Sequence, residues 1–208
     1  MSSAVIQMPS GGSPALPPGR LIFACDATAS REATWTVARE LQADMFRAAA
    51  PIGRLDLQLL FYGGDYCRVS KWTSNSEQLA QWMQKVECKG GKTQIERVLG
   101  HVLREHAKVP VQALTFIGDC CEEGADELFG LASQLGAAGL PAYMFHEGHD
   151  AQARQIFRMI ALRSGGAFYE FNTASKQAIN RLADQLGAVA RLAVGDSSGV
   201  MAIAAKKE

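Results

Sequence analysis

The segment Leu21-Ile22-Phe23-Ala24-Cys25 is apolar at every position and runs directly into Asp26. Short runs of this kind are typical of strands whose sheet is covered by helices on both faces. A second, mostly apolar run, Ala113–Ile117, continues through Gly118 into Asp119. We therefore expect two parallel strands that place carboxylates at the carboxyl edge of one sheet.

Strand-like runs recur along the chain, and segments with helical periodicity separate them. The other predicted strands are Leu55–Tyr62, Tyr66–Lys71, Leu140–Phe145 and Ala167–Phe171. Gly63-Gly64-Asp65 is a turn signal, so we expect the strand that follows it at a hairpin edge. Apolar stripes predict helices within residues 37–45, 95–103, 128–135, 156–160 and 179–189. The predicted fold class is α/β: a Rossmann-like, doubly wound, mostly parallel sheet with one antiparallel edge strand and helices on both faces.

The length of 208 residues is in the range of one domain. Residues 1–19 are rich in Ser, Gly and Pro, which predicts a flexible lead-in. Residues 20–193 then form the folded domain, and residues 194–208 form a C-terminal tail. Ser175 is a candidate N-cap of the last helix.

The bulk composition restricts the classes of partner. The formal net charge is +0, which disfavours broad electrostatic binding to nucleic acid or to an anionic membrane. The start of the chain lacks the pattern of a signal peptide, and no apolar run has the length of a membrane span. The five cysteines have no regular spacing, as expected of reduced thiols. We therefore expect a cytoplasmic protein, and the oligomeric state stays open.

Oxygen-bearing side chains accompany the two strand-end carboxylates. Thr28 and Ser30 follow Asp26 at alternate positions, so in an extended turn the three side chains would point the same way. Thr93 follows Gly90-Gly91-Lys92 and should begin a helix. Two carboxylates near each other would repel, and a bound cation relieves that repulsion. An all-oxygen set favours Mg²⁺ or Mn²⁺, with Ca²⁺ less favoured.

The motif Asp26-Ala27-Thr28-Ala29-Ser30, followed by Thr93 and then Asp119, resembles the metal-ion-dependent adhesion site of von Willebrand factor A domains. The likeness extends from about Leu21 to Arg191. It implies a Rossmann-like fold with Mg²⁺ or Mn²⁺ at the top of the sheet. It also implies that the three hydroxyls lie at the metal, that the carboxylates act through water, and that a Glu or Asp of a partner protein fills an open position. The sequence departs from the family pattern in having Thr28 in place of Ser.

The chain also carries motifs that could indicate other chemistry. Gly90-Gly91-Lys92-Thr93 resembles part of a phosphate-binding loop, but Val86 stands where that motif requires glycine. His146 and His149 could bind zinc from a loop, although further ligands are not evident. Cys120-Cys121 could be a redox element, and buried inert thiols are the alternative. Trp35, Trp72 and Trp82 are interpreted as packing residues.

The sequence thus favours a non-catalytic protein-interaction module that binds a divalent cation through Asp26, Thr28, Ser30, Thr93 and Asp119. Its partner would be a protein that presents a Glu or Asp carboxylate. One alternative is a Mg²⁺-dependent hydrolase or phosphoryl-transfer enzyme that uses Asp26. Another is a metal-free structural subunit in which Ser30 and Thr93 only cap helices.

Overall fold

The computed structural model describes residues 17–196, except the side chains of residues 32–34. Most of the predicted lead-in and tail lies outside these residues. The strands are β1 Gly19–Asp26, β2 Leu55–Gly63, β3 Tyr66–Thr73, β4 Ala113–Gly118, β5 Ala142–Glu147 and β6 Phe168–Phe171. They form one sheet in the order β3-β2-β1-β4-β5-β6. All neighbouring pairs are parallel except β2–β3, so the predicted fold class is confirmed.

The sheet changes winding direction between β1 and β4. The chain goes from β1 outward to β2 and β3, and then crosses to the other side of β1 to continue with β4, β5 and β6. Ligands of open α/β sheets bind beyond the carboxyl ends of the strands at such a switch point. Because β1 ends in Asp26 and β4 is followed by Asp119, both predicted carboxylates stand at this position.

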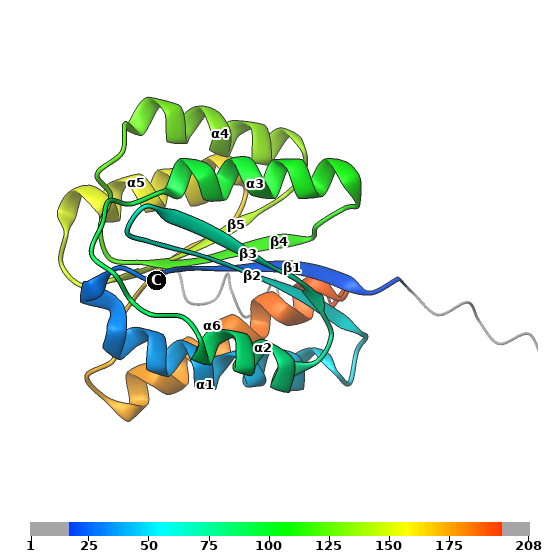
Figure 1. Cartoon of the computed structure of the whole chain (residues 1–208). Coiled ribbons are helices and arrows are strands. Elements are labelled where there is room, and N and C mark those ends of the chain that lie inside the picture. Colours follow the sequence, from blue (N-terminus) through cyan, green and yellow to red (C-terminus); the bar gives the residue numbers. More distant parts are fainter. Residues whose placement is uncertain (1–16, 197–208) are drawn as a thin grey trace, which may run out of the picture.

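Helices cover both faces of the sheet (Figure 1). The helices are α1 Glu32–Ala49, α2 Ser76–Gln84, α3 Ile95–Lys108, α4 Ala125–Ala137, α5 Ala151–Ser164 and α6 Lys176–Ala193. α1, α2 and α6 lie on one face, and α3, α4 and α5 lie on the other (Figure 1). None of the helices within residues 17–196 combines the length and apolarity needed to cross a membrane.

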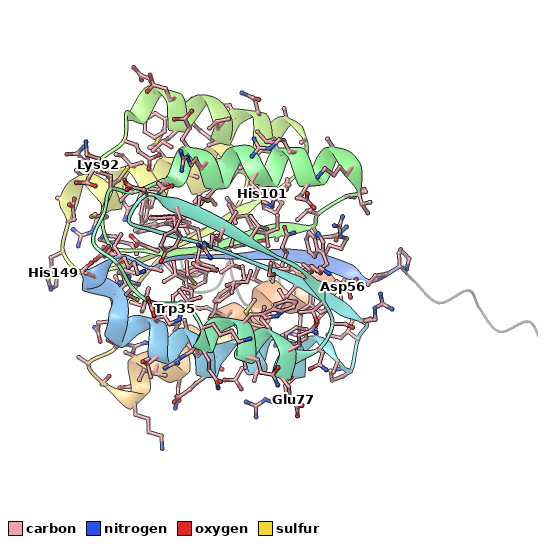
Figure 2. All side chains as sticks on the ribbon, viewed as in Figure 1. Trp35, Asp56, Glu77, Lys92, His101 and His149 are labelled. Carbon is pink, nitrogen blue, oxygen red and sulfur yellow. The ribbon has the colours of Figure 1, made fainter. Side chains whose placement is uncertain are left out.

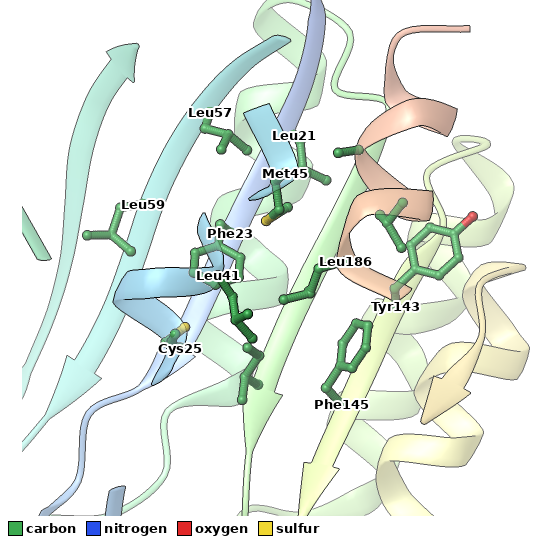
Figure 3. Packing of buried hydrophobic residues seen from close by; sticks show 14 of the residues in the cluster. Leu21, Phe23, Cys25, Leu41, Met45, Leu57, Leu59, Tyr143, Phe145 and Leu186 are labelled. Carbon is green, nitrogen blue, oxygen red and sulfur yellow. The ribbon is translucent and has the colours of Figure 1, made fainter. Parts of the chain in front are cut away.

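The side chains of β1 divide the core into two layers. Leu21, Phe23 and Cys25 face the layer of α1, α2 and α6, whereas Ile22 and Ala24 face the opposite layer. Figure 3 shows the first of these layers, in which residues of β1, β2 and β5 pack with residues of α1 and α6. All five side chains are at most 2% exposed, which explains why the strand is apolar at every position.

Two element predictions are corrected. Helix α2 was not predicted; its signals are the N-cap Asn75, whose side chain accepts hydrogen bonds from Glu77 N and Gln78 N, and a short apolar pair one turn apart. Strand β5 begins at Ala142 and not at Leu140. The amide of Leu140 instead donates to the Leu135 carbonyl at the end of α4, after Gly139 with φ of 68°.

Candidate metal centre

The first predicted loop gathers its oxygens through a tight turn. Asp26 ends β1, and its Oδ1 accepts a hydrogen bond of 2.7 Å from the Thr28 amide. A 3₁₀ helix, Ala29–Arg31, follows, so the extended turn that we expected is wrong. Thr28 Oγ1 and Ser30 Oγ still lie 3.3 Å apart. The two hydroxyls therefore converge, but the local helix brings them together and not an alternating extended backbone.

The second strand-end carboxylate meets this loop directly. Ser30 Oγ donates to Asp119 Oδ2 at 2.8 Å, across 89 residues of sequence. Asp119 Oδ1 is buried and has no hydrogen-bond partner. An ionised oxygen without a partner in a buried position is costly unless a cation or water binds it. The four side chains from Asp26 to Asp119 thus form one connected oxygen cluster with one unsatisfied oxygen.

Thr93 reaches the same edge of the sheet by a different route. Its hydroxyl accepts a hydrogen bond of 3.0 Å from the amide of Glu122, and its own amide donates to Glu122 Oε2 at 3.1 Å. Within the described residues, Thr93 makes no hydrogen bond to the other four predicted ligands. The loop of Thr93 is therefore linked to the loop of Asp119 through Glu122, a residue that was not predicted from the sequence.

Neither Ser30 nor Thr93 caps a helix. The N-cap residues of α1 and α3 are Arg31 and Gln94, and neither makes a side-chain capping bond. The first amides of α3 are satisfied from outside, because the Glu123 carboxylate accepts from Ile95 N at 2.6 Å and Glu96 N at 2.8 Å. The capping role that the metal-free alternative assigned to these two hydroxyls is therefore wrong. The sequence did contain one signal for such a partner. The start of α3 has no side chain of its own that caps it, so its first amides need an acceptor from another part of the chain, here Glu123.

Glycine contacts bring the loops close enough for this arrangement. The Gly64 amide donates to the Lys89 carbonyl, and the Lys89 amide donates to the Ala27 carbonyl, which links the β2–β3 hairpin to the loop after β1. A Cβ on Gly91 would lie 2.4 to 2.6 Å from backbone atoms of Gly64, so only glycine fits there. Figure 2 shows Lys92, the residue before Thr93, at the same end of the molecule as His149.

The two carboxylates lie in an environment that disfavours two unneutralised charges. Burial raises the pKa of Asp26 above its ordinary value, and the nearby Asp119 adds to this shift, while hydrogen bonds from Thr28 and the charge of Arg31 oppose it. Tyr62, also missed by the sequence analysis, donates from its hydroxyl to Asp26 Oδ2 at 3.2 Å. A divalent cation fits this donor set of carboxylates and hydroxyls.

The cysteines and histidines near the site do not form a second centre. Burial raises the pKa of Cys120 to about 12, with Asp119 as the next cause, which disfavours the thiolate form that a nucleophile requires. His146 lies within β5 and not in a loop, and its Nε2 is 3.1 Å from the Asp119 carbonyl oxygen. Among residues 17–196 no three His, Cys, Asp or Glu side chains group as a metal site.

Comparison with solved structures identifies the fold as that of von Willebrand factor A domains. The VWA domain of SpRpn10 aligns with a TM-score of 0.65 at 12% identity, covering 81% of this chain and 95% of that one. The conserved hypothetical protein BatB from Bacteroides thetaiotaomicron aligns with a TM-score of 0.61 at 15% identity, covering 83% and 98%. The expected resemblance is thereby confirmed at the level of the fold.

A third similar structure contains a bound metal ion. Proximal thread matrix protein 1 of the mussel byssus, with a zinc-occupied MIDAS motif, aligns with a TM-score of 0.60 at 17% identity; the match covers 85% of this chain and 46% of that one. No protein-family model and no curated protein sequence matches the chain.

Proposed function

We propose that this protein is a non-catalytic interaction module that binds a divalent cation and uses it to dock an acidic side chain of a partner protein. The observation that carries the proposal is the buried Asp119 Oδ1, which has no partner although its other oxygen is hydrogen-bonded to Ser30. A cation beside this oxygen would satisfy it and would offset the repulsion between Asp119 and Asp26.

The cation would be held by Asp26, Thr28, Ser30, Thr93 and Asp119. Because three of these ligands are neutral hydroxyls, the ion would keep much of its charge and attract an incoming carboxylate. Hard oxygen ligands favour Mg²⁺ or Mn²⁺ over softer ions. The residues of the chain supply oxygens and orientation. None of these residues is proposed to take part in a chemical step. Their proposed role is to hold the cation that recognises the partner. We also propose a cytoplasmic location, because the irregular spacing of the five cysteines is that expected of reduced thiols.

The metal part of the proposal is tested by thermal unfolding with Mg²⁺, Mn²⁺, Ca²⁺, Zn²⁺ or EDTA. At a Mg²⁺ concentration of 100 times Kd, binding stabilises the fold by about 2.7 kcal/mol, which for a chain of this size raises Tm by roughly 5–10 °C. Asp119→Asn should abolish the increase while leaving the melting temperature in EDTA equal or higher, because it removes one of two repelling charges. Thr93→Val should also abolish the increase.

Thr115→Val is the matched control for the loss of a hydroxyl. Thr115 is a buried residue of β4 whose hydroxyl has no hydrogen-bond partner, so this variant should keep the full response to Mg²⁺. An unchanged melting temperature of the parent protein at millimolar Mg²⁺ and Mn²⁺ would refute the metal site. Hydrolysis of phosphoesters that is lost in Asp26→Asn would instead refute the non-catalytic assignment.

A further inference from the structure

A groove runs along the outer edge of the sheet, between β3 and α2, and has a volume of about 460 Å³. We call it the edge groove. Leu59 and Phe61 of β2 and Trp82 of α2 give it apolar walls, and Val69 of β3, 39% exposed, adds apolar surface. Large apolar side chains that line an open groove provide a binding surface for apolar groups of a partner.

Three cations line the same groove. Arg68, Lys71 and Lys85 are exposed, and none of the ion pairs found within residues 17–196 includes any of them. No acidic residue is among the described residues that line the groove. Since the whole chain has a net charge of +0, this is a local excess of positive charge. The surface therefore complements a ligand that combines acidic and apolar groups.

The edge strand is poorly suited to accept another strand. The β2–β3 register shifts between Gln58 and Leu60, which is a bulge or irregularity in the pairing. In that region, Ser70 Oγ accepts from Leu59 N at 2.9 Å, and the Ser70 carbonyl accepts from Gln58 Nε2 at 3.1 Å. Bulges and lysines on an edge strand both oppose strand addition. Side chains of the ligand, and not its backbone, should therefore make the main contacts.

We propose that the edge groove binds an acidic segment of a partner protein that inserts a large apolar side chain between Trp82 and β3. The ends of this chain do not match this chemistry: residues 1–16 contain no acidic residue, and residues 197–208 contain two lysines and one glutamate. The groove lies on the face of α1 and α2, and none of its lining residues is a proposed metal ligand. The inference is therefore independent of the proposed function.

The test uses the full chain labelled with ¹⁵N and a synthetic peptide that alternates Glu with Leu and Phe. A peptide with Lys in place of every Glu is the comparison. The acidic peptide should shift the amide resonances of Leu59, Phe61, Val69, Lys71 and Trp82, both with Mg²⁺ and with EDTA. Lys71→Glu should weaken its binding roughly three- to tenfold, because one attraction becomes a repulsion. Lys176→Glu makes the same charge change at an exposed position of α6 and should have no effect.

Three results would overturn the proposal. In the first, the acidic peptide binds no more tightly than the lysine peptide. In the second, its shifts map to residues 26–30 and vanish in EDTA, which would mean that its carboxylates occupy the metal centre. In the third, the groove resonances shift with protein concentration alone, which would mean that a second copy of the chain occupies the groove. Failure of the Mg²⁺ response would not change the result expected in EDTA, so the two proposals fail separately.

Discussion

At the scale of single residues, Arg31 is a charged side chain that the fold removes almost entirely from water. Its side chain is 2% exposed, and its Nη1 is paired with the Glu147 carboxylate at the end of β5. The other Glu147 oxygen accepts from Thr173 Oγ1 at 3.0 Å. The pair therefore ties the 3₁₀ turn of the candidate metal centre to the loops after β5 and β6. Neither residue was predicted from the sequence.

Removal of Glu147 should destabilise the whole fold. Glu147→Ala leaves the buried Arg31 guanidinium without its partner, and its Nε has no hydrogen bond to compensate. We expect a loss of about 3–5 kcal/mol in the free energy of unfolding, measured by urea denaturation. Asp44→Ala is the control, because it removes the partner of Arg47, whose own side chain is 74% exposed. This variant should lose less than about 1 kcal/mol. Equal losses in the two variants would contradict this account.

At the scale of elements, the candidate metal centre depends on loops and not on helix caps. The loop 89–93 crosses the β2–β3 hairpin, with Gly91 against the backbone of Gly64. It then enters α3, whose first amides bind the carboxylate of Glu123 from the loop after β4. The position of Thr93 is therefore fixed by two other loops, each remote in sequence.

Two neighbouring glycines give a matched test of this arrangement. In Gly91→Ala the new Cβ would clash with Gly64, so the loop must shift; we expect a loss of about 1–3 kcal/mol in stability and a weaker Mg²⁺ response. In Gly90→Ala the new Cβ has nothing within 4 Å, so stability and the Mg²⁺ response should stay near the parent values. Chemical denaturation with and without Mg²⁺ measures both quantities. A stable, Mg²⁺-responsive Gly91→Ala protein would refute the proposed role of the loop.

At the scale of the whole molecule, burial of His101 should make the free energy of unfolding depend on pH. Burial lowers the pKa of His101 below its ordinary value of 6.5, while Glu105 opposes this shift and Arg104 and Lys108 support it. His101 Nε2 also lies 2.9 Å from Gln58 Oε1. Below pH 6.5 the unfolded chain therefore binds a proton more readily than the folded one, and the free energy of unfolding should fall as the pH is lowered.

Urea denaturation at several pH values between 7.5 and about 5, the range in which histidine titrates, measures this fall in the free energy of unfolding. His101→Gln should reduce the decline in stability toward acid pH. Part of the decline should remain, because burial also lowers the pKa of His146. His149→Gln, at an exposed position, is the control and should keep the parent profile. The same profile in His101→Gln and the parent protein would show that His101 does not cause the decline.

The sequence by itself determined the strands, most of the helices and the chain order of the polar loops. Leu21–Cys25 could be assigned because a strand buried on both faces must be apolar at every position, and this is a local property. The order of strand and helix signals then restricted the sheet to a doubly wound topology. The two strand ends that carry Asp26 and Asp119 followed from the same runs. Helix α2 was missed because its apolar pattern is short.

Only the tertiary structure decided which side chains meet. The contact between Ser30 and Asp119 spans 89 residues, and it exists because β4 pairs with β1. The same packing brings Glu122 to Thr93 and Glu147 to Arg31, although no local pattern relates the members of either pair. Sequence periodicity reports the burial of a residue within its own element. The partners of a loop residue depend on the strand order and on the close approach of separate loops.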